Sequence, residues 1–536
     1  MSTKISSFFT AMFAAIFRWM DGSLFFRGLT AALNFVKKIC GGSFIAQAFV
    51  GEAQPLENSL RRSYFAAFVN IIFNKIPKPV APPKYWPRGL SNLCRGSWFI
   101  NAFCHNMDTP IPPPGSRQDV GLGFKAFFQW AFFAAPVFAM GAVIFAAPFL
   151  PTMMLGALLV PVFFLLLLSR KFVVDGVTVF ILIFIIVSGV VAVFISFTPR
   201  QSIQIAVLTA IFMLSAPAVA AAAASRRSVD FFILIFVASA GFTGLAGMFQ
   251  VLTGQTTGEA YIDTTLFADI SFRVESFFGN ANVYATYLLI AIPIAAACMV
   301  YFKNTFLKLC AIGVTVLLLG NILLTFTRGA YVALPLAVIV FILLMEKRLF
   351  ILMLAFIPAL PIALPLVLPP NIMARLLSIA NLSDTSTSFR MAIWQGSIRI
   401  IRDFWLSGVG QGIDAYHTVY PYYALAAAGT AHSHNLYLQI LVEVGVVGFI
   451  IFVAIVACFF KVQINFFRRA TEFGQRAMSG AFMSAMVAFL VQSIFDYSFF
   501  NYSIRLTFYL FIGLSVAFTQ AHKTKNTILE ERAAAV

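Results

Sequence analysis

Long apolar runs separated by short polar stretches dominate the chain from residue 126 onward. Each run has about 20 residues, the length that an α-helix needs to cross the hydrocarbon core of a bilayer. The pattern predicts an all-α integral membrane protein with about twelve transmembrane helices. The predicted spans are 126–147, 149–168, 174–197, 202–224, 230–252, 281–301, 306–326, 330–345, 348–367, 435–460, 477–496 and 503–520. For the first two spans, Pro148 and Pro151 leave a kinked hairpin open as the alternative.

The polar segments divide the chain into five parts. We expect transmembrane helices 1–9 within 126–368, one large extracytoplasmic loop with short helices at 369–434, and transmembrane helices 10–12 within 435–520. Residues 1–125 come before these parts, and residues 521–536 follow them as a cytoplasmic tail. The layout predicts a single membrane unit with one substantial external cap.

Charge placement indicates which side each loop occupies. Hydrophobic residues make up 60% of the chain and charged residues 11%, which excludes an ordinary soluble domain. Every lysine falls in residues 1–125, in the tail or in alternate connecting loops. By the positive-inside rule these segments are cytoplasmic, so we expect a multi-pass protein of the cell membrane with both termini inside. The net charge of +17 then reflects topology and attraction to anionic membrane lipids, and nucleic acid is not an expected partner.

Residues 1–125 form a separate basic unit, with 14 basic and five acidic side chains. Its short Phe/Ala-rich stretches are flanked or interrupted by Arg and Lys, which is typical of amphipathic helices lying in the cytoplasmic interface. Arg18 interrupts the first stretch and argues against a signal peptide. Residues 77–89 and 108–119 are proline-rich linkers. A docking surface and a plain membrane anchor both remain open for this unit.

The predicted external segments contain arginine but no lysine. The planar, always-charged guanidinium is suited to bidentate grips on phosphate. For any single arginine, tolerance of the interface or pairing with a local acid such as Asp403 or Asp496 is the alternative. For the group near the histidines we favour pyrophosphate binding. The external arginines are Arg200, Arg273, Arg328, Arg375, Arg390, Arg399, Arg402 and Arg505.

The large loop contains one strong helical pattern, at residues 388–405, followed by a glycine-rich turn. Arg399 and Arg402 lie three residues apart on its polar face. We expect the turn to be a loop; a phosphate cradle is the less favoured alternative, because no strand–helix context follows. The predicted apolar stripe is Phe389, Ile393, Ile400 and Phe404, and the turn glycines are Gly408, Gly410 and Gly412.

Two of the five histidines, His432 and His434, stand at the mouth of the span 435–460, directly after the large loop. Imidazole is the natural proton acceptor near neutral pH. The two residues point in different directions and cannot easily serve one proton. Glu443 follows about 13 Å deeper in the helix. For this intramembrane carboxylate we favour a structural role, paired with an arginine or with a polar helix contact.

Four segments together resemble the O-antigen ligase and polymerase family of bacterial membrane glycosyltransferases. They are FRVESFFGNANVYATYLLIAIPIA (272–295), LTFTRGAYVAL (324–334), FRMAIWQGSIRIIRDFWLSGVGQG (389–412) and HSHNLYLQILVEVGVVG (432–448). The last fits the family's ligase signature: His, then Asn, Ser or Gln, nine residues, Gly, two residues, and Gly, Thr or Tyr. Its positions here are His434, Asn435, Gly445 and Gly448.

The resemblance implies transfer of a glycan from undecaprenyl diphosphate to an acceptor hydroxyl at the outer face of the cytoplasmic membrane, in the assembly of cell-envelope polysaccharide. It implies that His434 activates the hydroxyl as general base and that Arg273 and Arg328 hold the diphosphate. Arg390 and Trp394 resemble the Arg-x-x-x-Leu element of the ligase loop. Because Trp replaces Leu, the choice between ligase and polymerase is left in doubt.

Physical chemistry agrees with these roles. Fixed guanidinium groups can stabilise the charge that develops on a leaving diphosphate, and a sugar hydroxyl needs a base before it attacks. The register of the motif selects His434 over His432. We therefore expect a metal-independent glycosyltransferase without cofactor, acting on a lipid-linked glycan and a glycan or lipid acceptor. The alternatives are a lipid-linked-sugar flippase or other transporter, and a non-enzymatic component of a polysaccharide export complex. Besides His434, the expected site residues are Arg273, Arg328, Arg390, Arg399 and Arg402 for the diphosphate, and Asn435, Glu443 and His432 as possible supporting residues.

Overall fold

All regular secondary structure in the described part of the chain is helical, as predicted. The structure is a computed structural model. It describes residues 135–169, 175–223, 225–254, 272–380, 385–425 and 429–522. The predicted interfacial helices of residues 1–125 and the tail beyond 522 lie outside these residues.

Nine helices within the described residues are long and apolar enough to cross a membrane. Each corresponds to one of the twelve predicted spans. They are α10 (Gly176–Val190) with its continuation η1 (Val191–Ile195), α11 (Pro199–Ala222), α12 (Arg226–Thr253), α13 (Ala281–Tyr301), α14 (Thr305–Leu324), α15 (Arg328–Met345), α21 (Leu436–Arg469), α22 (Phe473–Phe495) and α23 (Tyr502–Ala521).

The other three predicted spans coincide with shorter or interrupted helices, so the count of twelve stays a prediction. The first two correspond to a helix at Ala135–Ala146 and to α9 (Thr152–Ser169). Pro148 and Pro151, which lack a backbone N–H, lie between the two helices, whereas α9 continues through Pro161. The ninth is divided into α16 (Lys347–Phe356), η2 (Ile357–Ala359) and α17 (Leu360–Val367).

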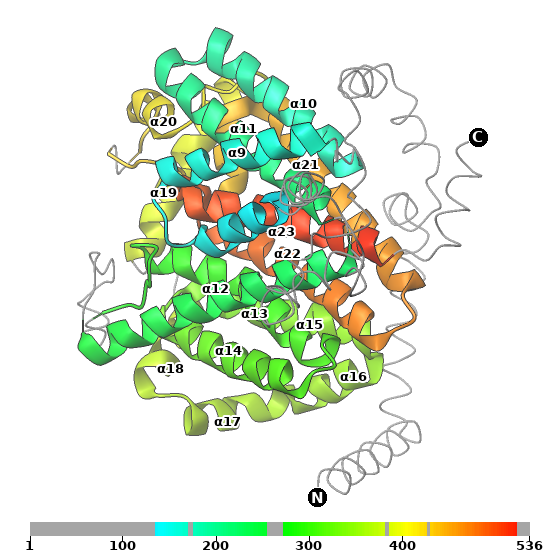
Figure 1. Cartoon of the computed structure of the whole chain (residues 1–536). Helices are drawn as coiled ribbons and strands as arrows, with labels where there is room; N and C mark the ends of the chain where they lie inside the picture. The colour runs from blue at the N-terminus through cyan, green and yellow to red at the C-terminus, as the bar shows by residue number, and fades with distance from the viewer. Residues whose placement is uncertain are drawn as a thin grey trace, which may run out of the picture.

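Consecutive spans alternate in direction, so their connections fall at two opposite ends of the bundle (Figure 1). One end, which we call the arginine end, holds residues 272–280 and the short helices of the large loop. The other, the lysine end, joins α12 to the loop before α22 through the ion pair Arg226–Glu472, at 3.5 Å. The short helices at the arginine end are α18 (Pro370–Leu377), η3 (Ser378–Ala380), α19 (Thr385–Asp403), α20 (Ile413–Val419) and η4 (Tyr420–Tyr422).

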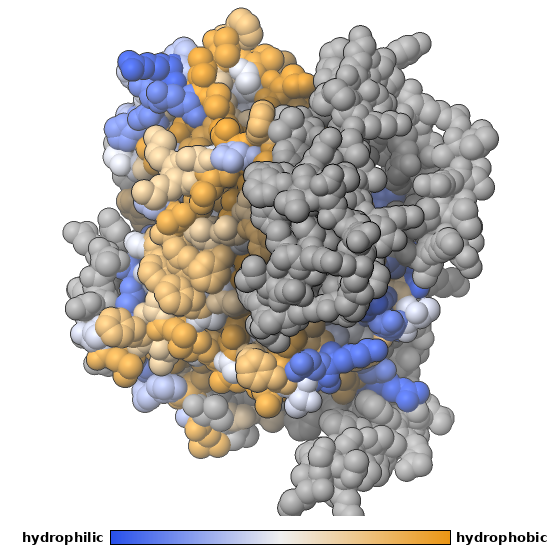
Figure 2. All heavy atoms as spheres, in the orientation of Figure 1, coloured by the Kyte–Doolittle hydropathy of each residue, from blue (hydrophilic) through white to orange (hydrophobic). Residues whose placement is uncertain are grey.

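The apolar core runs through the centre of the bundle, where α22 and α23 lie (Figure 1). There α13 and α15 pack on α22, and α11 packs on α23. Aromatic rings from α22, the η5 turn (Ser498–Phe500) and α23 pack together. The ring centre of Phe489 lies 4.5 Å from that of Phe508, and the ring centre of Phe508 lies 5.2 Å from that of Phe499. The visible surface between the two ends is largely apolar, and hydrophilic groups gather toward the ends (Figure 2). This distribution suits a bundle surrounded by lipid.

Helix α21 is broken near its N-terminal end. Gly445 has φ 67° and ψ −173°, which interrupts the helical hydrogen-bond ladder. The freed groups pair with the segment after α19: the Val409 amide donates to the Val442 carbonyl at 2.8 Å, and the Val446 amide donates to the Trp405 carbonyl at 2.7 Å. The break therefore docks the large loop onto the start of α21.

The glycine-rich turn is a loop, as predicted, and its glycines serve close packing. Gly408, Gly410 and Gly412 all have positive φ values, of 67°, 109° and 95°. A Cβ on Gly408 would lie 2.5 Å from the Glu443 carbonyl oxygen, and one on Gly410 would overlap the Ser196 hydroxyl. Only glycine allows the loop to approach α21 and the start of α11 this closely.

Candidate active site

The loop before α21 presents His434 at the arginine end. Asn435 is the N-cap of this helix: its side-chain oxygen accepts hydrogen bonds from the amides of Tyr437 and Leu438, at 2.9 and 3.0 Å. Its side-chain amide donates to the Ile494 carbonyl at 2.9 Å. Asn435 therefore caps α21 with its side-chain oxygen and joins the start of α21 to the end of α22 with its side-chain amide. Both contacts give it a structural role beside the histidine.

Asp496, the residue directly after α22, is the partner of His434. The Nδ1 atom of His434 lies 3.4 Å from Oδ1 of Asp496. Burial by itself would raise the pKa of the Asp496 carboxyl, but His434 and Arg390 lower it to about 2. A carboxylate that is charged at neutral pH favours the tautomer with the proton on Nδ1. This tautomer leaves Nε2 of His434 as a proton acceptor.

Arg273 is anchored deep in the arginine end. Its Nε atom donates to the Thr325 carbonyl at 2.7 Å, and its Nη2 atom donates to Asn282 Oδ1 and Thr327 Oγ1 at 2.7 and 2.9 Å. Burial and the positive charges of two other arginines lower its pKa to about 9. The group is still charged at neutral pH, so it is a fixed cation held by neutral oxygens.

The two arginines acting on Arg273 are Arg375 of α18 and Arg390 of α19. Arg375 is buried and donates through Nε to the Phe326 carbonyl at 3.2 Å. Arg390 interacts electrostatically with Asp496 and with His432 as well. The arrangement brings three guanidinium groups and the His434–Asp496 pair to one place. A cluster of arginines has the electrostatic character of an anion-binding site.

The other three predicted arginines lie in different surroundings. Arg328, at the first position of α15, reaches the Ser378 carbonyl with Nη1 at 3.4 Å, which places it next to α18. Arg399 and Arg402 are exposed on α19. None of the contacts among the described residues links these two to the three-arginine cluster.

Glu443 belongs to a separate buried network below the site. Its Oε1 atom accepts hydrogen bonds from Gln439 Nε2 at 3.0 Å and from the Tyr497 hydroxyl at 3.3 Å. Arg505 donates to the same hydroxyl through Nη2 at 3.2 Å. Glu443 thus makes a polar contact with Gln439 of its own helix, one of the two expected structural contacts, and reaches Arg505 only through the Tyr497 hydroxyl.

One part of the predicted amphipathic stripe is wrong. Helix α19 is present, and Ile393 and Ile400 are fully buried against Tyr416 and Tyr420. Phe389 is 46% exposed, because it lies near the start of α19, before the part that packs on α20 and η4. The two tyrosines stack on each other with their ring centres 5.0 Å apart, so their rings stabilise the cap itself.

Sequence reasoning did not select Asp496 or Arg375 as site residues. Asp496 lies 62 positions after His434, outside the motif that identified the histidine. Arg375 was one of eight external arginines with no motif around it. Neither residue belongs to a sequence motif that also contains the histidine. Folding brings them there through the end of α22 and through α18.

The described part of the chain is a multi-pass helical membrane protein with a basic site at one end of its bundle. Residues 313–453 match the family model of O-antigen ligase. The match confirms the predicted resemblance over these residues, which make up about a quarter of the chain. It covers Arg328, Arg375, Arg390, His432 and His434, while Arg273 and Asp496 lie outside it. No curated protein matches the chain.

Proposed function

We propose that the protein is a membrane glycosyltransferase that transfers or polymerises undecaprenyl-diphosphate-linked oligosaccharide onto a hydroxyl of a glycan or lipid acceptor. The observation that carries the proposal is the cluster of Arg273, Arg375 and Arg390, which are half-buried or buried, beside the His434–Asp496 pair. A diphosphate leaving group needs fixed positive charge, and an acceptor hydroxyl needs a base. Both groups occur at the same end of the bundle, within reach of the bilayer interface where a lipid-linked donor resides.

The arginines bind the donor diphosphate. Arg273, Arg375 and Arg390 surround the position where the anion is bound, and Arg328 approaches it from the start of α15. Because Arg273 is held by three oxygen acceptors, it does not need to reorganise during the reaction. Arg399 and Arg402, exposed on α19, attract the anionic donor toward this site.

His434 acts as the general base. Its Nε2 atom takes the proton of the acceptor hydroxyl as that oxygen attacks the anomeric carbon of the donor sugar. The bond between this carbon and the diphosphate oxygen breaks, and the electron pair leaves with the diphosphate. Asp496 holds the imidazole and stabilises the imidazolium that forms.

The arginine end faces the outside of the cytoplasmic membrane. The described lysines all lie toward the lysine end: Lys303 in the connection between α13 and α14, and Lys308, Lys347 and Lys461 in helices. The positive-inside rule places that end in the cytoplasm. Both termini are then cytoplasmic, and the site opens where exported lipid-linked glycans accumulate.

Reconstitution tests the proposal. Full-length protein in proteoliposomes receives the lipid-linked glycan extracted from membranes of its own host, with and without an added acceptor. We expect longer or transferred glycan with the wild type and none with His434→Ala, while the exposed His417→Ala serves as the matched control. Equal product with His434→Ala would refute the assignment of the base. Product without added acceptor indicates a polymerase, whereas a strict need for acceptor indicates a ligase.

A lipid-linked-sugar flippase is the competing function, and the same vesicles distinguish it. A flippase would move the donor between leaflets without changing its glycan, and movement would continue in His434→Ala. The cluster of Arg273, Arg375 and Arg390 next to a base favours chemistry at that end over passage through the bilayer midplane.

A further inference from the structure

The backbone of His434 adopts a conformation that its side chain disfavours. Its φ is 50°, in the left-handed region where a Cβ is crowded by the carbonyl oxygen. Such conformations persist when the surroundings hold them, and they concentrate at functional sites. One contact holds this one directly: the His434 amide donates to Nδ1 of His432 at 3.3 Å.

His432 is itself fixed on several sides. It is 7% exposed, and its ring stacks on Phe500 with centres 4.8 Å apart and planes 15° apart. The ring of Tyr497 meets it edge-on at 5.4 Å, and the Thr430 hydroxyl donates to its carbonyl oxygen at 3.1 Å. These contacts fix the orientation of the His432 ring, and therefore the direction of its Nδ1 lone pair.

The acceptor role requires a neutral ring with no proton on Nδ1. Burial is the main effect that lowers the pKa of His432, and the positive charge of His434 and Arg390 lowers it further, to about 3 in spite of Asp496. The ring of His434 lies 4.3 Å away. His432 therefore stays neutral near physiological pH.

We propose that His432 is a positioning residue: its Nδ1 atom accepts the His434 amide, locks the left-handed turn, and so aims the His434 ring at Asp496. The inference rests on the proposed function for the role of His434. It gives His432, which the motif register passes over, a role of its own. One is a buried, neutral hydrogen-bond acceptor, and the other is the proton acceptor of the reaction.

Two substitutions separate the hydrogen bond from the packing. His432→Phe keeps a ring on Phe500 but removes the acceptor, whereas His432→Asn places an oxygen where Nδ1 was and removes the ring. In the vesicle assay we expect His432→Phe to lower kcat by about tenfold to a hundredfold with little change in the KM for the donor, as for a displaced catalytic group. We expect His432→Asn to retain much more of kcat. The same substitutions at exposed His417 are the controls.

A spectroscopic measurement is independent of the glycan donor. Full-length protein labelled with ¹⁵N only in histidine gives signals from five residues, which single-site variants assign. We expect an unprotonated Nδ1 for His432 from about pH 5 to 8, and a shifted His434 signal in His432→Phe but not in His432→Asn. A protonated His432 in this range, or equal loss of kcat in both variants, would overturn the proposal. Absence of glycan transfer with the wild type would refute only the proposed function, since the His434 signals still report the positioning.

Discussion

At the scale of single residues, the site depends on how each charge is held. Asp496 is 3% exposed and carries its charge because His434 and Arg390 lie beside it. A buried carboxylate without such partners would be neutral at physiological pH. The aspartate and the histidine therefore support each other, and neither has its proposed role alone.

Replacing Asp496 with asparagine tests this dependence. The amide preserves size but loses the charge that selects the Nδ1-protonated tautomer of His434. We expect kcat to fall by about a hundredfold or more, with folded protein recovered in normal yield. Steady-state transfer assays and gel filtration measure the two quantities. Unchanged kcat in Asp496→Asn would show that the pair does not act in catalysis.

The third guanidinium of the cluster offers a second test. Arg375→Lys keeps the charge but removes the planar fork, so we expect weaker donor binding, by about tenfold in KM, and a smaller effect on kcat. Arg227→Lys, at the lysine end, is the matched control and should behave as the wild type. A donor KM that is equal in both variants would exclude Arg375 from diphosphate binding.

The buried His432 also predicts a pH dependence of stability. Its pKa is lowered from the usual 6.5 to about 3 in the folded chain, so the unfolded chain takes up a proton at higher pH. Stability from this group is complete above about pH 6.5 and is lost as the pH falls toward 3, by at most about 1.4 kcal/mol per pH unit. Thermal unfolding in detergent should show a steeper loss of Tm on acidification for the wild type than for His432→Asn. Parallel pH profiles would contradict a buried neutral imidazole.

At the scale of elements, the break in α21 joins the large loop to the membrane bundle. Its two sides are bound to the segment that follows α19, so the site residues on α19 and those before α21 are held in one unit. Gly445 and Gly448, which belong to the motif, lie at positions where a larger side chain would clash or strain the backbone. A Cβ on Gly448 would meet the Val444 side chain, and Gly445 alone permits the backbone turn.

Gly445→Ala tests the importance of this break. The added Cβ would lie 2.3 Å from the Leu406 carbonyl oxygen, at a φ of 67°. We expect a loss of at least about 1–2 kcal/mol in stability from backbone conformation alone, with reduced transfer because α19 is displaced. Gly313→Ala, where α14 has open space, is the control and should be neutral or slightly stabilising. Tm measured in detergent distinguishes the two, and equal values would argue against a rigid junction.

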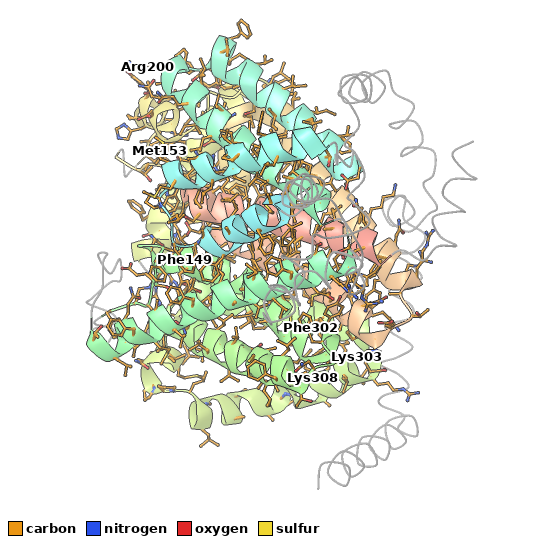
Figure 3. The ribbon with its side chains drawn as sticks, in the orientation of Figure 1. Phe149, Met153, Arg200, Phe302, Lys303 and Lys308 are labelled. Carbon is orange, nitrogen blue, oxygen red and sulfur yellow. The ribbon has the colours of Figure 1, made fainter. Side chains whose placement is uncertain are left out.

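At the scale of the whole molecule, the two ends of the bundle differ in their basic residues, since the described lysines all lie toward one end, and in proposed exposure. Arg200 begins α11 on the side of α20, while Lys303 and Lys308 lie toward the other end, near the start of α14 (Figure 3). Arg200→Cys and Lys303→Cys, in a background without the six native cysteines, test this orientation. We expect a membrane-impermeant maleimide to label position 200 in intact cells and position 303 only after permeabilisation. The reverse result would invert the topology and place the site in the cytoplasm.

The sequence by itself determined the class of protein and selected His434 as the candidate base. Apolar length and lysine placement are one-dimensional properties, because a helix must be about 20 residues long to cross a bilayer wherever its neighbours lie. The motif fixed His434 for the same reason, since its residues are close along the chain. Only the tertiary structure could single out Arg375 and Asp496, give Glu443 its bridge through Tyr497, and give His432 its contact with the His434 amide. Burial, charge proximity and a left-handed backbone depend on segments far apart in the sequence, and packing alone brings these together.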